Sequence, residues 1–85
     1  MKIWGKTRLD NHTLSSRTVT VHVKSAAEVE DWSEPFAKLC HELDIARPVI
    51  LSKHTRELAV FGHTVFYPAD FMEPVAFDRF EIELF

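Results

Sequence analysis

The clearest constraint in the sequence is a strict alternation of apolar and polar side chains over residues 17–24. The residues that point one way are Val19, Val21 and Val23, and those that point the other way are Thr18, Thr20, His22 and Lys24. A period of two is typical of a β-strand with one buried face and one wet face. Residues 2–9 are predicted to form a second strand, and Asp10-Asn11-His12 supplies turn-forming residues between the two. The sequence therefore predicts a β-hairpin.

Charge is divided unevenly along the chain. The net charge is −3, yet residues 1–25 carry five bases and one acid (+4), and residues 26–85 carry five bases and twelve acids (−7). Residues 77–85 alternate again, with Glu81 and Glu83 on one face and Phe80 and Ile82 on the other. An acidic strand beside the basic hairpin would account for this division; a basic face for an anionic partner is the alternative. Nucleic acid is disfavoured as a partner, because phosphate binding needs more net base.

The segment after the hairpin has the pattern of a helix. Ser25 and Glu28 have the spacing of a capping box. Apolar residues follow at intervals of three and four, and they are Val29, Trp32, Phe36, Leu39, Cys40 and Leu43. Pro35 does not fit the interior of one straight helix. Either the helix kinks at Pro35, or a short first helix ends near Asp31 and Ser33 caps a second one; we favour the second interpretation.

Shorter elements are predicted beyond Arg47-Pro48, where the helical region ends. Val49-Ile50-Leu51 has the apolar character of a strand, and Ser52 caps a helix over 53–60 that Gly62 closes. Leu58 and Phe61 are expected to face inward from this helix. Residues 63–67 are predicted to form a strand or an extended arm, followed by a turn at 68–70 and by Phe71 and Met72 packed against the core.

These elements predict one domain, residues 1–85, of the α+β class with the order β-β-α-β-α-β-β. The hairpin and the C-terminal strand are expected to share a mostly antiparallel sheet. One main helix and one short helix would pack on its apolar face, giving a two-layer structure.

The cysteine content indicates a reducing compartment. Cys40 is the only cysteine, so no intrachain disulfide is available. The N-terminal residues show no signal-peptide pattern, and no stretch reaches the roughly 18 apolar residues of a transmembrane helix. We therefore expect a cytoplasmic protein that does not contact a membrane. Cys40 lies on the apolar helix stripe and is expected to be buried and structural.

Motifs for catalysis or cofactor binding are missing from the sequence. Two glycines, Gly5 and Gly62, are too few for a phosphate-binding loop. The five histidines have no established metal-ligand spacing and are interpreted as scattered surface residues. We therefore expect no cofactor, no metal site and no catalytic residues.

Aromatic residues are concentrated in the C-terminal half. Seven of them fall within residues 61–85, and Phe66 and Tyr67 are adjacent, so a strand would point them to opposite faces. Either the turn over 68–74 or another protein chain would cover the second face. We favour a non-enzymatic binding or assembly module that uses this half, with itself as a homodimer or with another protein as partner. The alternative is a small ligand-binding or catalytic protein with a groove between residues 47–57 and 63–73. Its polar contacts would come from Arg47, Lys53, His54 and Tyr67.

Three blocks of sequence carry a resemblance: residues 1–6, residues 40–48 and residues 77–84. With these blocks the chain resembles, over nearly its whole length, a family of short single-domain bacterial proteins of unknown function. The resemblance implies a stand-alone cytoplasmic domain and carries no activity, ligand or catalytic residue.

Overall fold

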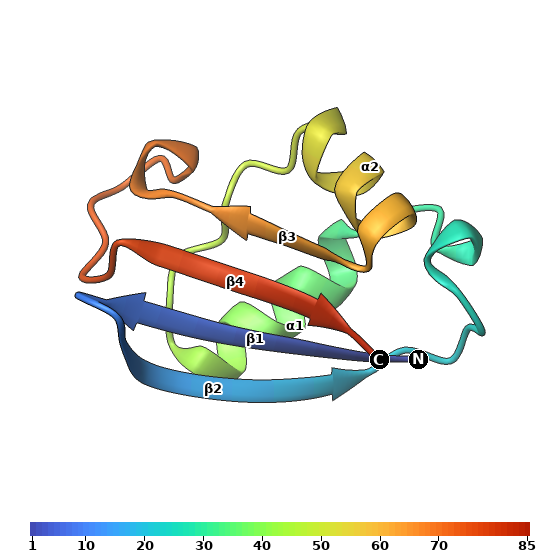
Figure 1. Cartoon of the computed structure of the whole chain (residues 1–85), viewed down its shortest axis with the longest axis horizontal. Coiled ribbons are helices and arrows are strands. Elements are labelled where there is room, and N and C mark those ends of the chain that lie inside the picture. Colours follow the sequence, from blue (N-terminus) through green and yellow to red (C-terminus); the bar gives the residue numbers. More distant parts are fainter.

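Four antiparallel strands form one sheet in the order β2-β1-β4-β3 in the computed structural model, which describes residues 1–85 (Figure 1). The strands are β1 (Lys2–Leu9), β2 (His12–Thr20), β3 (His63–Phe66) and β4 (Arg79–Leu84). The helices are α1 (Ser33–Leu43) and α2 (Ser52–Phe61), with two short 3-10 turns, η1 (Ala26–Glu28) and η2 (Pro68–Asp70). This arrangement confirms the predicted two-layer α+β class. Since β1 and β4 pair in the middle of the sheet, the two chain ends lie side by side (Figure 1).

The hairpin forms where it was expected, but its second strand is displaced. Asp10 and Asn11 both have positive φ angles, 52° and 66°, as a tight two-residue hairpin turn requires. The chain therefore reverses at once, and β2 begins at His12 rather than at residue 17. It ends at Thr20 rather than at residue 24. The α-amino group of Met1 donates to the carbonyls of Val21 and Val23 beyond the end of β2 (3.1 and 3.0 Å).

The acidic C-terminal strand lies beside the basic hairpin strand, as the charge division predicted. Lys6 pairs with Glu81 in the register of β1 and β4. The Glu81 carboxylate lies 3.8 Å from Lys6 Nζ, from Arg8 Nε and from Arg79 Nη1. Three cations therefore share one half-buried acid on the sheet face that points away from α1.

We expect Glu81→Lys to destabilise the fold, because it replaces these attractions with a cluster of four cations. An exposed ion pair contributes about 0.2–1 kcal/mol, so the loss should be about 1–2 kcal/mol at low salt and smaller in 1 M NaCl. Urea unfolding at both ionic strengths measures it. Glu83→Lys is the matched control, since Glu83 forms no ion pair within 4 Å. An equal loss at low and high salt would contradict the electrostatic account.

The helical region divides before Pro35, as the favoured interpretation predicted, but Ser33 is the first residue of α1 and not its cap. Pro35 is the third residue of α1, where its missing N–H is one of those that a helix start leaves unpaired. The predicted helix start at Ser25 is wrong: only the three-residue turn η1 forms, and the Ser25 side chain caps nothing. Glu28 Oε2 accepts a bond from the Lys24 amide instead (2.8 Å). Asp31 Oδ1 accepts from the Ser33 amide (2.9 Å) and supports the start of α1.

One face of α1 packs on the sheet and forms the core. Its buried residues are Phe36, Leu39, Cys40 and Leu43, with Trp32 just before the helix. They meet the inward side chains of the strands, which include Ile3, Phe66, Phe80 and Ile82. Gly5 makes the close approach possible, because a Cβ at this position would lie 2.6 Å from Leu39 Cδ2 and 3.1 Å from Phe80 Cε1.

Three predictions for the second half of the chain are wrong. Residues 49–51 form no strand: Pro48 and Phe71 make a single bridge, and the chain then turns into α2. Phe61 is 65% exposed, because α2 buries only His54 and Leu58 and Phe61 ends the helix beside the edge strand β3. Met72 is 91% exposed, whereas Phe71 is buried as expected. Gly62 closes α2 with a φ of 74°, as predicted.

Candidate functional site

The predicted binding residues do not converge on one groove. Lys53 and Tyr67 line a hollow of about 250 Å³ between α2 and β3. Arg47 lines a different hollow, beside Pro48 and Ile50. His54 and Phe66 are fully buried and reach no surface. Of the polar groups proposed for a groove between residues 47–57 and 63–73, the structure brings only Lys53 and Tyr67 together.

His54 holds two segments together inside the fold. Its ring packs on Phe66 with centroids 4.1 Å apart, and its Nδ1 accepts a hydrogen bond from the Leu51 amide (3.0 Å). Its Nε2 lies 3.8 Å from Asp70 Oδ2, which accepts a bond from the Tyr67 amide (2.8 Å). Burial lowers the pKa of His54, although the nearby Asp70 opposes that shift. The imidazole is therefore neutral at pH 7. It bonds the start of α2 and packs on β3, while its buried Nε2 has no hydrogen-bond partner.

We expect stability to fall as the pH drops below about 6.5, the ordinary histidine pKa. Below that pH, His54 binds a proton in the unfolded chain but not in the folded protein. Protonation therefore favours the unfolded state until the pH reaches the lowered pKa of folded His54. One such group changes the free energy of unfolding by at most about 1.4 kcal/mol per pH unit. Urea titrations between pH 5.5 and 7.5 measure the slope. His54→Asn keeps an acceptor for Leu51 and should flatten it; an unchanged slope would assign the effect to other groups.

Cys40 is buried, as predicted, with 1% of its surface exposed. Burial raises the pKa of its thiol to about 11, although the positive charge of Arg47 acts in the opposite direction. The reactive thiolate is thus scarce at neutral pH. This environment is that of a packing residue and not of a nucleophile.

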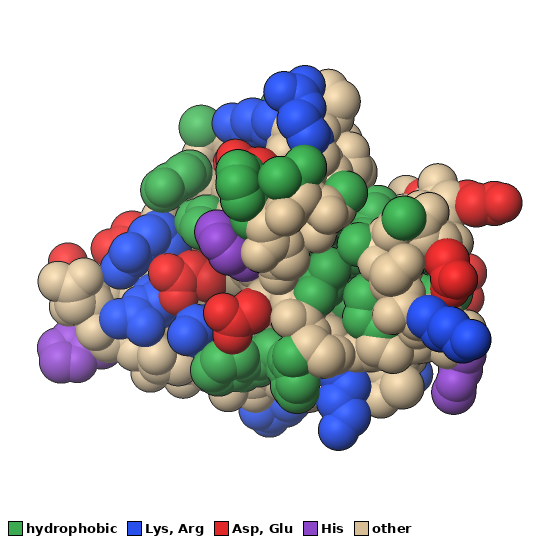
Figure 2. All heavy atoms as spheres, turned by 45° about the vertical axis from the view of Figure 1, so that its right-hand side comes forward, with side chains coloured by type: hydrophobic (Ala, Val, Ile, Leu, Met, Phe, Trp, Pro, Cys, Tyr) green, Lys and Arg blue, Asp and Glu red, His purple; other side chains and the backbone are tan.

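The open edge of β3 and the neighbouring end of α2 carry exposed apolar side chains. We call Val60, Phe61, His63, Val65 and Tyr67 the α2–β3 surface. Val60 is 66% exposed, Phe61 65% and Tyr67 51%, and the Phe61 ring stacks on His63 with centroids 5.9 Å apart. Figure 2 shows hydrophobic side chains among charged ones on the end of the molecule where these elements meet. The α2–β3 surface therefore combines exposed apolar side chains with the charged neighbours Lys53 and Glu57.

The backbone of β3 is also available for pairing. The Leu84 amide donates to the Gly62 carbonyl (2.8 Å), which makes these two residues a hydrogen-bonded position of the β3–β4 ladder. Bonded and non-bonded positions alternate along antiparallel strands. The amide and carbonyl groups of His63 and Val65 therefore point to the free edge. Behind them, the Thr64 hydroxyl donates to Glu57 Oε1 (2.6 Å) and fixes β3 against α2.

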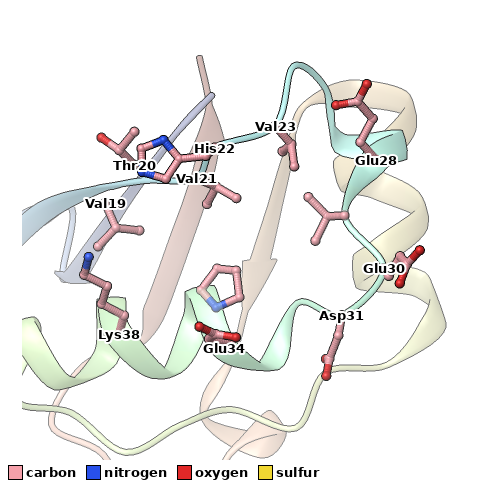
Figure 3. Close-up of a pocket in the computed structure, with 12 residues that line it drawn as sticks. Val19, Thr20, Val21, His22, Val23, Glu28, Glu30, Asp31, Glu34 and Lys38 are labelled. Carbon is pink, nitrogen blue, oxygen red and sulfur yellow. The ribbon is translucent and has the colours of Figure 1, made fainter.

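The largest hollow lies at the opposite edge of the sheet, where no site was predicted. It measures about 540 Å³ and lies between the end of β2, the loop over residues 28–31 and the first turns of α1 (Figure 3). We call it the β2–α1 groove. Valines of the predicted strand form its floor, and the acids between residues 28 and 34 form its far wall. The run of acids between residues 28 and 34 was the available sequence signal.

The structure offers no grouping of metal ligands and no membrane helix. No three His, Cys, Asp or Glu side chains come close enough to hold a metal ion. None of the helices combines the length and the apolar character needed to cross a membrane.

Comparison with family models, with curated proteins and with solved structures gives no match to this chain.

Proposed function

We propose that the protein is a non-enzymatic binding module that associates through the α2–β3 surface, in the first place with a second copy of itself. The observation that carries the proposal is the exposure of two aromatic side chains, Phe61 at 65% and Tyr67 at 51%, beside an unpaired strand edge. Aromatic residues are enriched at protein interfaces, where they bury large areas. An unpaired edge adds backbone groups that a second strand satisfies.

A second copy fits this surface by symmetry. Two β3 strands related by a twofold axis run antiparallel, so the outward groups of His63 and Val65 in one copy meet the same groups in the other. Lys53 and Glu57, four residues apart on α2, border the same hollow. A twofold arrangement runs the two helices in opposite directions, so each lysine can face the glutamate of the other copy.

A small ligand in the hollow between α2 and β3 is the second candidate, supported by the approach of Lys53 and Tyr67. The hollow holds about 250 Å³, below the roughly 300–1,000 Å³ of usual ligand pockets. The surface therefore suits a protein partner better than an enclosed ligand. The unpaired Cys40 and the resemblance to short bacterial proteins further support a cytoplasmic location as part of the proposal.

Sedimentation equilibrium at micromolar concentration tests the proposal. We expect an average mass above the 9.9 kDa of the monomer that rises with concentration. The double variant Phe61→Asp/Tyr67→Asp should return it to the monomer mass with an unchanged circular dichroism spectrum. Leu14→Asp is the matched control, because Leu14 is 52% exposed on β2, the opposite edge strand.

Two results would reject this function. A constant monomer mass up to 1 mM would exclude self-association. A dimer that survives the double variant and dissociates in Leu14→Asp would place the interface at the other edge.

A further inference from the structure

The β2–α1 groove combines three features that point to one kind of occupant. Its floor is apolar: Val19 is buried, and Val21, Val23, Val29 and Pro35 are half-buried. Figure 3 shows Val19, Val21 and Val23 on the side of the strand toward α1, with Thr20 and His22 on the other. A floor of this kind accepts the aliphatic part of a side chain laid across it.

The far wall of the groove is acidic. Glu28, Glu30, Asp31 and Glu34 line it, and all four are exposed. None forms an ion pair with a Lys, Arg or His side chain within 4 Å, although such pairs form on the outer sheet face. The Asp31 carboxylate accepts bonds from Ser33, which lower its pKa and keep it charged. This wall therefore presents uncompensated negative charge beside an apolar floor.

The strand side of the groove has free backbone groups. The Met1 α-amino group donates to the Val21 carbonyl (3.1 Å) and the Val21 amide donates to the Met1 carbonyl (2.9 Å), so the two residues form a hydrogen-bonded pair at the end of the β1–β2 ladder. The alternation along the ladder then turns the amide and carbonyl groups of Thr18 and Thr20 toward the free edge. A groove between an edge strand and a helix, with free backbone groups on the strand, is the geometry of strand addition.

We infer that the β2–α1 groove binds an extended, basic segment of another protein, which adds to β2 as a fifth strand. Residues opposite Thr18 and Thr20 pair by their backbones and point outward. The residue between them points into the groove. Lys or Arg is the side chain that matches both linings, since its aliphatic stem covers the valines while its charged end reaches the carboxylates.

Lys38 gives the groove a direction. It lies on α1 at the Val19 end of the groove. Glu34 lies on the same helix, and the other acids lie toward the opposite end (Figure 3). The charge of Lys38 opposes a basic side chain at the Val19 end of the groove, so Lys38→Glu should tighten binding of a basic segment severalfold.

The probe is a blocked seven-residue peptide of alternating threonine and arginine, and binding is measured by calorimetry in 150 mM salt. We expect it to bind and the matching threonine–glutamate peptide not to bind. Glu30→Lys/Glu34→Lys should weaken binding by about tenfold or more, from two lost attractions and two added repulsions. Glu42→Lys/Glu73→Lys is the matched control, because it changes the net charge equally at exposed acids outside the groove.

N-methylated peptides test the strand geometry without altering the protein. Methyl groups on the threonine amides should abolish binding, because those amides face β2 when arginine points inward. Methyl groups on the arginine amides should leave it within about twofold. Equal effects of the two methylation patterns, equal loss in the control charge variant, or no binding of the arginine peptide at millimolar concentration would each overturn the inference.

The proposed function and this inference fail separately. Phe61→Asp/Tyr67→Asp removes the proposed dimer surface and should leave peptide binding unchanged. If Glu30→Lys/Glu34→Lys dissociates a dimer instead, the groove is filled by a second copy and the inference is overturned.

Discussion

Replacing Phe66 with alanine is expected to lower the free energy of unfolding by about 3–5 kcal/mol. The side chain is fully buried, and its ring packs against Phe36, His54 and Phe80. Small domains are stabilised by only about 5–15 kcal/mol in total, so the loss is a large part of the whole. Urea unfolding, at a concentration below that of self-association, measures it.

Tyr67→Ala is the matched control, since it truncates the adjacent aromatic side chain, which is 51% exposed. Its cost should stay below about 1 kcal/mol. A comparable loss in the two variants would mean that Tyr67 is also part of the core, and the α2–β3 surface would then lose its main residue. Phe66 supports that surface from behind and is not itself a contact residue.

Replacing Gly5 with alanine should destabilise the fold by about 1–3 kcal/mol, the usual cost of overpacking a core. In a strand interior, alanine normally makes a protein more stable than glycine does, by about 0.5–1 kcal/mol. At this position we expect the opposite effect on stability. The added Cβ would lie 2.6 Å from Leu39 Cδ2 and 3.1 Å from Phe80 Cε1, and both side chains are fully buried. Thermal and urea unfolding of the variant measure the effect.

A double-mutant cycle with Leu39→Ala identifies the cause. Alone, Leu39→Ala leaves a cavity and should cost about 2–5 kcal/mol. In the Gly5→Ala background it also removes the clash. The stability loss of the double variant should therefore be about 1 kcal/mol smaller than the sum of the two single losses. Strict additivity would show that the Gly5 effect comes from the strand backbone and not from the contact with α1.

The two proposed surfaces lie on opposite edges of one sheet. β2 is the edge strand on one side and β3 on the other, with β1 and β4 between them. Each edge borders a helix, α1 or α2, and each has a hollow between helix and strand. A module of this shape can hold a basic segment at β2 while a second copy occupies β3, because neither surface uses residues of the other.

The sequence by itself determined the elements whose information is local. Asp10 and Asn11 determined the hairpin turn, and the apolar stripe determined the buried face of α1, Cys40 included. The valine alternation indicated the second strand, although only Val19 of the three valines lies within β2. The acidic alternation of residues 79–84 determined the neighbour of the basic strand, because unlike charges had to face each other there. Apart from the turn, each of these patterns repeats every two, three or four residues, and such a repeat indicates which residues share one face of a strand or helix.

Only the tertiary structure decided which residues share a surface. His54 looked like a ligand contact on a short polar helix, but α2 turns it inward onto Phe66, and Phe61 is left outside at the strand edge. Residues 49–51 had the composition of a strand, but the chain makes only one bridge there before α2 begins. The β2–α1 groove joins a strand end to residues 28–38, and its shape depends on how α1 packs across the sheet. Packing of this kind is set by long-range contacts such as Gly5 against Leu39, which no local pattern encodes.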